Sequence, residues 1–259
     1  MKTAMRAHYP DLAGEHVLIT GGANGIGAAV ARGFAAQGCR ITLLDRDGEA
    51  GARVVEECRA LGAHAELRQV DLADARALAE VLARVKRDMP AVDVLIANAG
   101  HDPRFDGLEM TEQQWNELFQ LNVTHYFVTC RELIPSMIEH GGGGVVLTAS
   151  HTVWLAKPDL IAYNTTKAAI VGLMRSLAEA FGRHGIRVNA VAPGWTMTER
   201  QLRQWVTDEA RQRTIHELQA LPLEITPEEL VGTYLFLASD SSRPITRQVL
   251  VADAGQSKH

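Results

Sequence analysis

Residues 20–27 read TGGANGIG and join a short apolar run to the start of a helical pattern. Gly21 permits a tight turn, Gly25 lets the backbone approach a pyrophosphate, and Gly27 lets the following helix pack close to the preceding strand. The first N–H groups of that helix are free and carry a partial positive charge, so they attract phosphate. The flanking strand and helix distinguish this pattern from a glycine-rich turn without a ligand. We therefore predict that a dinucleotide contacts Gly21, Asn24, Gly25, Ile26 and Gly27.

Short apolar runs alternate with longer helical patterns along the chain. The runs span residues 16–20, 40–45, 66–70, 92–97, 145–148 and 187–191. Most are apolar throughout, as strands covered on both faces are. The helical patterns span residues 25–37, 49–61, 74–88, 111–139 and 162–183. This alternation predicts one α/β domain over residues 1–259, with helices on both faces of a parallel sheet.

Three glycines and two capping sequences mark where these helices end and begin. Gly38, Gly62 and Gly185 stand just past helical patterns, where a left-handed C-cap belongs. The segment 111–114, TEQQ, has the spacing of a capping box. The segment 226–229, TPEE, predicts a further helix start with proline in its first turn.

The composition is that of an ordinary globular protein. Hydrophobic residues make up 46% of the 259 residues and charged residues 22%, close to globular averages. The 26 Lys and Arg against 31 Asp and Glu give a formal net charge of −5, whereas nucleic-acid binders carry a basic excess or stripe. We therefore predict no nucleic-acid partner.

Cysteine usage and hydropathy predict a cytoplasmic protein. Cys39, Cys58 and Cys130 are odd in number and form no CxxC pair, which suits reduced thiols in a reducing compartment. No apolar run reaches the ~18 residues of a membrane span, so we predict no membrane partner. Residues 1–10 lack the apolar core of an export signal.

Asp45 ends the second apolar run, 18 residues after Gly27. A carboxylate near this offset accepts hydrogen bonds from the adenosine ribose and repels a 2′-phosphate. Arg46 follows directly and could pair with that phosphate. Because the carboxylate itself occupies the ribose position, we predict contacts from Asp45 and Arg46 and a preference for NAD over NADP. A solvated carboxylate at a strand end is the alternative.

Two further strand ends carry candidate cofactor contacts. Asp71 and Leu72 close the third apolar run and are predicted to border the adenine. Asn98, Ala99 and Gly100 follow the fourth run, at the carboxyl edge where ligands bind in such sheets. Small residues there let the cofactor approach closely, and a simple turn is the alternative.

Tyr163 and Lys167 stand four residues apart and therefore share one face of a predicted helix. An ammonium and an oxidised nicotinamide near the phenol both favour the phenolate, lowering its pKa from about 10 toward working pH. Ser150 stands 13 residues before Tyr163, at a strand end, where its hydroxyl can hold the substrate oxygen. Taken alone, the YxxxK spacing equally describes an amphipathic helix with a surface lysine.

The motifs in combination resemble the classical short-chain dehydrogenase/reductase family over roughly residues 10–255; they are TGGANGIG, Asp45, NAG at 98–100, Asn122, Ser150, YNTTK at 163–167 and PG at 193–194. The resemblance implies a single Rossmann-type domain with a seven-stranded parallel sheet. It implies Tyr163 as general acid/base and Lys167 as the residue that lowers its pKa and binds the nicotinamide ribose. It further implies that Ser150 orients substrate and that Asn122 holds a water relaying protons to Lys167.

The same resemblance extends to the segment after the sixth run. It implies that Pro193, Gly194, Thr196 and Thr198 grip the nicotinamide carboxamide and the pyrophosphate. The chain departs from the family pattern at Ala149, where a serine is frequent, and in the segment 251–255, which has alanines in place of glycines.

Polar and aromatic residues follow the strand ends that carry these motifs, and a sugar needs such groups more than a fatty or steroidal substrate does. The segments 101–104, 157–170 and 199–210 are similar to those of NAD-dependent aldose 1-dehydrogenases in this family. We therefore predict a sugar contacted by Asp102, Arg104, Ser150, His151, Trp154, Tyr163, Asn164 and Trp195. A surface ion pair for Arg104 and core packing for the tryptophans are the alternatives. His101 and Asp102 have no further ligands at a suitable spacing, so we predict no metal.

These features predict an NAD-dependent oxidation of an aldose at the anomeric carbon to its lactone. One alternative is an NAD(H)-linked alcohol dehydrogenase or ketone reductase acting on another polar small molecule. Another is a dinucleotide-binding protein without turnover, which the intact Ser150, Tyr163 and Lys167 disfavour.

Two features concern architecture beyond the sheet. The segment 195–221 is polar and helix-prone, which predicts an insertion that acts as a lid over the site. The helical segments 111–139 and 162–183 carry more apolar positions than one sheet face requires. Together with the usual state of the family, these positions predict a homotetramer.

Overall fold

Seven parallel strands form one central sheet, in the order β3-β2-β1-β4-β5-β6-β7. The computed structural model describes residues 7–105 and 108–258. The strands are β1 (His16–Thr20), β2 (Arg40–Asp45), β3 (Ala65–Gln69), β4 (Val94–Ala97), β5 (Gly143–Thr148), β6 (Ile186–Pro193) and β7 (Val249–Ala252). The predicted parallel α/β fold is confirmed. β1 and β2 have the predicted bounds, whereas β7 lies outside the six apolar runs that predicted the strands.

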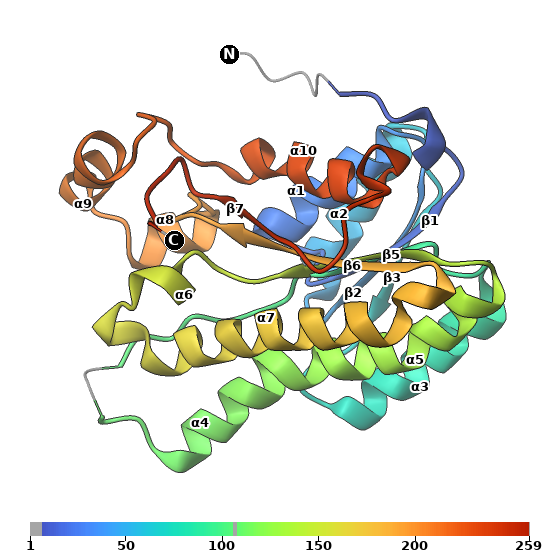
Figure 1. The fold of residues 1–259 in the computed structure, drawn as a ribbon, viewed down its shortest axis with the longest axis horizontal. Helices are drawn as coiled ribbons and strands as arrows, with labels where there is room; N and C mark the ends of the chain where they lie inside the picture. Colours follow the sequence, from blue (N-terminus) through green and yellow to red (C-terminus); the bar gives the residue numbers. More distant parts are fainter. Residues whose placement is uncertain (1–6, 106–107, 259) are drawn as a thin grey trace.

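Helices cover both faces of the sheet (Figure 1). They are α1 (Gly25–Ala35), α2 (Gly48–Ala60), α3 (Ala75–Asp88), α4 (Glu112–Phe119), α5 (His125–Glu139), α6 (Thr152–Leu155), α7 (Ile161–Phe181), α8 (Glu199–Gln204), α9 (Asp208–Arg213) and α10 (Pro227–Ala238). Every helix within the described ranges is too short or too polar to cross a membrane.

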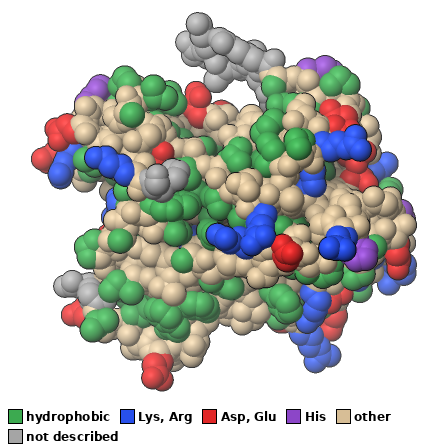
Figure 2. Space-filling view, viewed as in Figure 1, with side chains coloured by type: hydrophobic (Ala, Val, Ile, Leu, Met, Phe, Trp, Pro, Cys, Tyr) green, Lys and Arg blue, Asp and Glu red, His purple; other side chains and the backbone are tan. Residues whose placement is uncertain are grey.

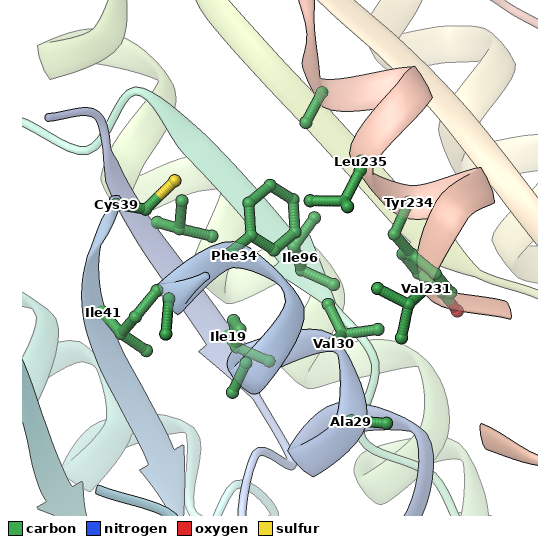
Figure 3. Packing of buried hydrophobic residues seen from close by; sticks show 14 of the residues in the cluster. Ile19, Ala29, Val30, Phe34, Cys39, Ile41, Ile96, Val231, Tyr234 and Leu235 are labelled. Atoms are coloured by element: carbon green, nitrogen blue, oxygen red, sulfur yellow. The ribbon is translucent and has the colours of Figure 1, made fainter. Parts of the chain in front are cut away.

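Apolar side chains of the strands are buried on both faces of the sheet. On one face Phe34 of α1 packs with Val231 and Tyr234 of α10 above Ile19 of β1 (Figure 3). On the other face, α3, α5 and α7 pack against the sheet through a second cluster that includes Tyr126. Because strands covered on both faces need apolar residues throughout, the continuous apolar runs in the sequence follow from this burial.

The predicted helix boundaries hold where backbone chemistry sets them. Gly38, Gly62 and Gly185 adopt left-handed φ angles of +85°, +90° and +76° just past helices. Thr111 and Gln114 form the predicted capping box at α4. The predicted helix over 111–139 is interrupted by a π-helical turn at Gln120–Thr124 between α4 and α5. Such single turns add a residue to the helix and re-aim the side chains around them.

The order of the strands places a crevice at the carboxyl edge of the sheet. From β1 the chain builds the sheet outward through β2 and β3, then returns to the other side of β1 with β4. The loops after β1 and β4 therefore diverge and leave room between them. α8 lies at the same end of the sheet as α6 (Figure 1). On the face drawn in Figure 2, lysine and arginine side chains are interspersed with acidic ones.

Candidate active site

A cavity of about 750 Å³ opens at this carboxyl edge. It gathers residues that follow six of the seven strands, together with residues of α7 and α8. The predicted site residues in its lining are Gly21, Asn24, Gly25, Ile26, Asp45, Arg46, Asp71, Leu72, Asn98, Ala99, Gly100, Asp102, Arg104, Ser150, His151, Tyr163, Lys167, Pro193, Gly194, Trp195, Thr196 and Thr198.

Four predicted site residues lie outside this lining, namely Gly27, Asn122, Trp154 and Asn164. Trp154 packs against the hydrophobic cluster beneath α7. The Asn164 side chain donates a hydrogen bond from Nδ2 to the Lys157 carbonyl over 3.2 Å. Both residues thus have structural contacts, and the structure does not bring them to the cavity.

The glycine loop is shaped by close backbone contacts. A Cβ on Gly27 would lie 2.0 Å from the Gly21 carbonyl oxygen, and a Cβ on Gly21 would lie 2.7 Å from Cα of Ala99. The Asn98 side chain donates from Nδ2 to the Gly21 carbonyl over 3.1 Å and so fixes the loop to β4. The loop leaves open space before the N-terminus of α1, which is the shape and polarity that a pyrophosphate requires.

Asp45 is held rigidly beside this loop. Its two carboxylate oxygens accept hydrogen bonds from the backbone N–H groups of Ala23 and Asp47, each over 3.0 Å. A carboxylate has about four lone-pair sites, so two remain for ligand hydroxyls. Asp45 lines the cavity together with Arg46. These residues fit the ribose of a dinucleotide whose phosphates lie at the glycine loop.

Lys167 and Tyr163 project from α7 toward the loops after β4 and β5. The Lys167 ammonium donates hydrogen bonds to the Thr148 carbonyl over 2.8 Å and to the Tyr126 hydroxyl over 3.4 Å. Its nitrogen lies 5.8 Å from the centre of the Tyr163 ring. Ser150 follows β5, and its hydroxyl is hydrogen-bonded to the Thr152 hydroxyl over 2.9 Å. The cavity thus brings together three of the four predicted catalytic side chains, all except Asn122.

Burial dominates the ionisation of this group. It raises the pKa of Tyr163, while the Ser150 hydroxyl and the charge of Arg200 offset part of the rise. Burial lowers the pKa of Lys167 to about 7. The expected lowering of the tyrosine pKa is therefore absent from the protein alone, because burial and the charge of Asp102 outweigh the groups that favour the phenolate.

Asn122 occupies the π-helical turn between α4 and α5 and is fully buried. Its Oδ1 accepts a hydrogen bond from the His101 N–H over 2.9 Å, and its Nδ2 donates to the His101 carbonyl over 2.8 Å. The amide therefore fixes the loop that follows β4, just beyond Gly100. The Asn122 side chain therefore acts on the site indirectly, by holding that loop in place.

Asp102 connects the β4 loop to α8. Its carboxylate accepts from Arg200 over 2.6 Å and from the Gln201 amide over 2.7 Å. Gln201 in turn accepts a hydrogen bond from the Trp195 indole over 3.0 Å. Arg200 also contacts His101 Nδ1 over 3.0 Å. These contacts hold the start of the 195–221 segment against the loop that follows β4.

The cavity is also lined by Arg104, which follows β4, by His151, which follows β5, and by Lys157, which precedes α7. The Arg104 guanidinium lies 4.5 Å above the Trp205 ring and 3.4 Å from the Asp159 carboxylate. Burial lowers the pKa of His151 to about 4, although the carboxylate of Asp253 opposes the shift, so the imidazole is neutral near pH 7. Its buried Nδ1 has no hydrogen-bond partner among the described residues.

The sequence prediction missed Lys157, Arg200 and Gln201, which all line the cavity. Lys157 stands six residues before Tyr163, in the loop that must enter the site, and this position was an available signal. Arg200 and Gln201 both donate hydrogen bonds to Asp102, which stands almost a hundred positions earlier in the sequence. Nothing local in the sequence connects the two segments. Within the described ranges, no three His, Cys, Asp or Glu side chains gather in a way that could hold a metal.

Comparison with known proteins relates the whole chain to dehydrogenases. The family model described as short chain dehydrogenase matches residues 15–209. A Rhizobium meliloti protein named probable galactose dehydrogenase GalD is 39% identical over 254 residues, covering 98% of this chain and 99% of its own. D-xylose 1-dehydrogenase of Caulobacter vibrioides is 36% identical, covering 96% and 98%. A Beutenbergia cavernae crystal structure, described as an NAD(P)-dependent gluconate 5-dehydrogenase with bound NADP, has a TM-score of 0.89 at 33% identity, covering 94% and 97%.

Proposed function

Because the chain belongs to the short-chain dehydrogenase/reductase family, we propose that it oxidises a sugar at the anomeric hydroxyl to its lactone, with NAD as the hydride acceptor. The observation that carries this proposal is that Ser150, Tyr163 and Lys167 share one cavity with the glycine loop. The likeness to proteins named galactose and xylose dehydrogenases supports a sugar as the substrate class.

The residues divide the chemistry among them. A bound oxidised nicotinamide would supply the hydride acceptor and a positive charge beside the phenol. The Tyr163 phenolate removes the proton of the anomeric hydroxyl while the same carbon gives up its hydrogen as hydride, so the carbon loses two electrons and becomes a carbonyl. Ser150 donates a hydrogen bond to that oxygen and keeps it within reach of Tyr163. The Lys167 ammonium stabilises the phenolate, whose proton is later released to water.

Asp45 is the basis for proposing NAD rather than NADP. Its position is fixed by two backbone hydrogen bonds, so it cannot move away from a 2′-phosphate without breaking them. Like charges brought together in a binding site cost several kcal/mol. Arg46 lines the same part of the cavity and offsets part of this repulsion. We expect kcat/KM to be at least ten-fold higher with NAD, and a higher value with NADP would refute the preference.

The sugar contacts are assigned from the lining of the cavity. Arg104 can hold two neighbouring hydroxyls with one fork of donors, His151 offers a neutral imidazole, and Trp195 offers a ring face. The Asp102 carboxylate already accepts hydrogen bonds from Arg200 and Gln201, so we propose that it holds the lid segment 195–221 in place. Hydroxyls left unpaired in a closed site cost about 1–3 kcal/mol each, which makes these contacts decisive for choice of sugar.

A panel of substrates tests this function. Purified protein is incubated with pentoses, hexoses, 6-deoxyhexoses and simple secondary alcohols, each with NAD and with NADP, and reduced nicotinamide is followed by absorbance. We expect reduction with at least one aldose and a lactone product. Activity on a simple alcohol, with none on sugars at tens of millimolar, would instead support the alternative function of an alcohol dehydrogenase or ketone reductase.

We also propose a homotetramer. Phe127 of α5 and Ile161 of α7 leave 48% and 43% of their surface exposed on the outer helices, and symmetric pairing of these helices would cover them. Light scattering at micromolar concentration is expected to give four times the chain mass of 28.2 kDa. A species of single-chain mass would reject the assembly.

We also propose that the protein resides in a reducing compartment, such as the cytoplasm. Cys39, Cys58 and Cys130 are buried and free. Burial raises the pKa of Cys39 and Cys130 to about 12 and that of Cys58 to about 11. Such thiols remain protonated and react slowly with oxidants.

A further inference from the structure

Two positively charged side chains line the substrate end of the cavity, and the charge of one nearby carboxylate acts on both. Arg104 and Lys157 both line the cavity. Asp159 lies 3.4 Å from the Arg104 guanidinium. The Lys157 ammonium forms no ion pair within residues 7–105 and 108–258; its contact is with the Trp195 ring, 5.8 Å away. This group of three therefore carries one uncompensated positive charge.

The surroundings of Arg104 and Lys157 reflect this imbalance of charge. Burial and the charge of Arg104 lower the pKa of Lys157, and Asp159 only partly opposes them. The Arg104 Nε is buried and lacks a hydrogen-bond acceptor among the described residues. Buried donors and charges are normally satisfied by a partner. An anion entering the cavity would offset the excess positive charge of the two side chains that line it.

Among the described residues, the neighbouring charges do not supply that anion. Asp102 is held by Arg200 and Gln201. Glu199 and Arg203 also line the cavity, but both are exposed and of opposite sign. The ring of Trp205 lies under Arg104 and that of Trp195 under Lys157. Aromatic faces hold cations in place without neutralising them.

We propose that Arg104 and Lys157 form a carboxylate subsite, so that the preferred substrate is a sugar acid, an aldose with a carboxylate at the end remote from the oxidised carbon. This inference rests on the proposed function, since it names the substrate of the same site. The uncompensated charge is a single one, which matches a carboxylate better than a doubly charged phosphate. With such a substrate, the forked donors of Arg104 bind the carboxylate in place of two hydroxyls.

Matched substrates test the subsite. D-Galactose and D-galacturonate differ only at the sixth carbon, and D-galactose 6-phosphate adds a dianion there. We expect kcat/KM for galacturonate to exceed that for galactose at least ten-fold in the wild type. Lys157→Gln should reduce this ratio to between one and two, and Lys157→Arg should restore most of it. Arg76→Gln removes a charge outside the cavity and should leave the ratio unchanged.

Calorimetry separates failure of this inference from failure of the proposed function. The same two sugars are titrated into protein saturated with NAD. If neither sugar is oxidised, the proposed function fails, but tighter binding of galacturonate that Lys157→Gln abolishes would still support the subsite. Equal affinity for the two sugars, or a preference that Lys157→Gln leaves intact, would overturn it. A phosphate ester that binds more tightly than the carboxylate would overturn the choice of anion.

Discussion

The two ends of the cavity are built from different parts of the chain. At the cofactor end, backbone atoms of the glycine loop, the N-terminus of α1 and the short residues after β4 make the surface. A Cβ added in the glycine loop would lie as close as 2.0 Å to a neighbouring atom, and the hydrogen bond that joins the loop to Asn98 spans 3.1 Å. At the substrate end, long polar side chains make the surface. Asp102 there holds α8 through Arg200 and Gln201.

The two ends therefore differ in what they recognise: one binds a group that all dinucleotides share, and the other binds a particular substrate. A surface of backbone N–H groups recognises phosphates that every dinucleotide carries, and it tolerates few substitutions. A surface of long side chains can be changed one residue at a time without disturbing the sheet. We infer that the cofactor end sets the reaction class, and the substrate end sets which molecule reacts. The predictions below test the two ends and the residues at which they meet.

Tyr163→Phe should give the largest effect, because it removes the proton acceptor where the two ends meet. We expect kcat to fall by about 10²–10⁴-fold, the usual contribution of a positioned acid/base. The phenylalanine ring keeps the packing, so NADH affinity, measured by fluorescence, should change less than three-fold. A variant that retains more than a tenth of the wild-type kcat would contradict the role of Tyr163.

Gly27→Ala tests whether the cofactor end depends on close backbone packing. The added Cβ would lie 2.0 Å from the Gly21 carbonyl oxygen and 2.7 Å from Asn98 Nδ2. Overpacking of this kind costs about 1–3 kcal/mol, so NADH should bind at least ten-fold more weakly in a variant that circular dichroism shows to be folded. Gly232→Ala in α10 is the control, because nothing lies within 4 Å of its added Cβ. Unchanged NADH affinity in Gly27→Ala would refute the packing argument.

The cofactor end was also the part that the sequence predicted best. Apolar runs, glycines and strand-end residues are local signals, and the α1 loop, Asp45 and the Tyr163–Lys167 pair all lie where the motifs place them. The substrate end depends on contacts between distant segments, such as Asp102 with α8. Asn164 and Trp154 neighbour the site in sequence, but their side chains turn to the Lys157 carbonyl and to the core. Local patterns do not encode these choices.

Asp102→Asn tests whether the substrate end can change independently. The substitution keeps the shape and weakens the ion pair with Arg200, which is partly exposed at 38% of its side chain. Pairs of this kind contribute about 0–1 kcal/mol, so KM for the preferred sugar should rise two- to five-fold while NADH affinity stays within two-fold. Arg200→Gln should have the same effect, and the double variant should add little to either. Additive effects would show that the two residues do not act through their contact.

Lys167→Met tests the boundary between the two ends through the pH dependence of stability. The lysine pKa is lowered to about 7 by burial, whereas an unfolded chain keeps the proton up to about 10.4. Between these values the unfolded state binds more protons, so the wild type should gain stability as pH rises from 7 to 9, relative to a variant without the ammonium. We expect a relative gain of about 2 kcal/mol, or several degrees in Tm. Lys86→Met, at the surface of α3, is the control and should show no such pH dependence. A constant difference between wild type and Lys167→Met across this range would mean that Lys167 keeps its proton in the folded protein, and the buried ammonium would then be fully compensated by the Thr148 carbonyl and Tyr126.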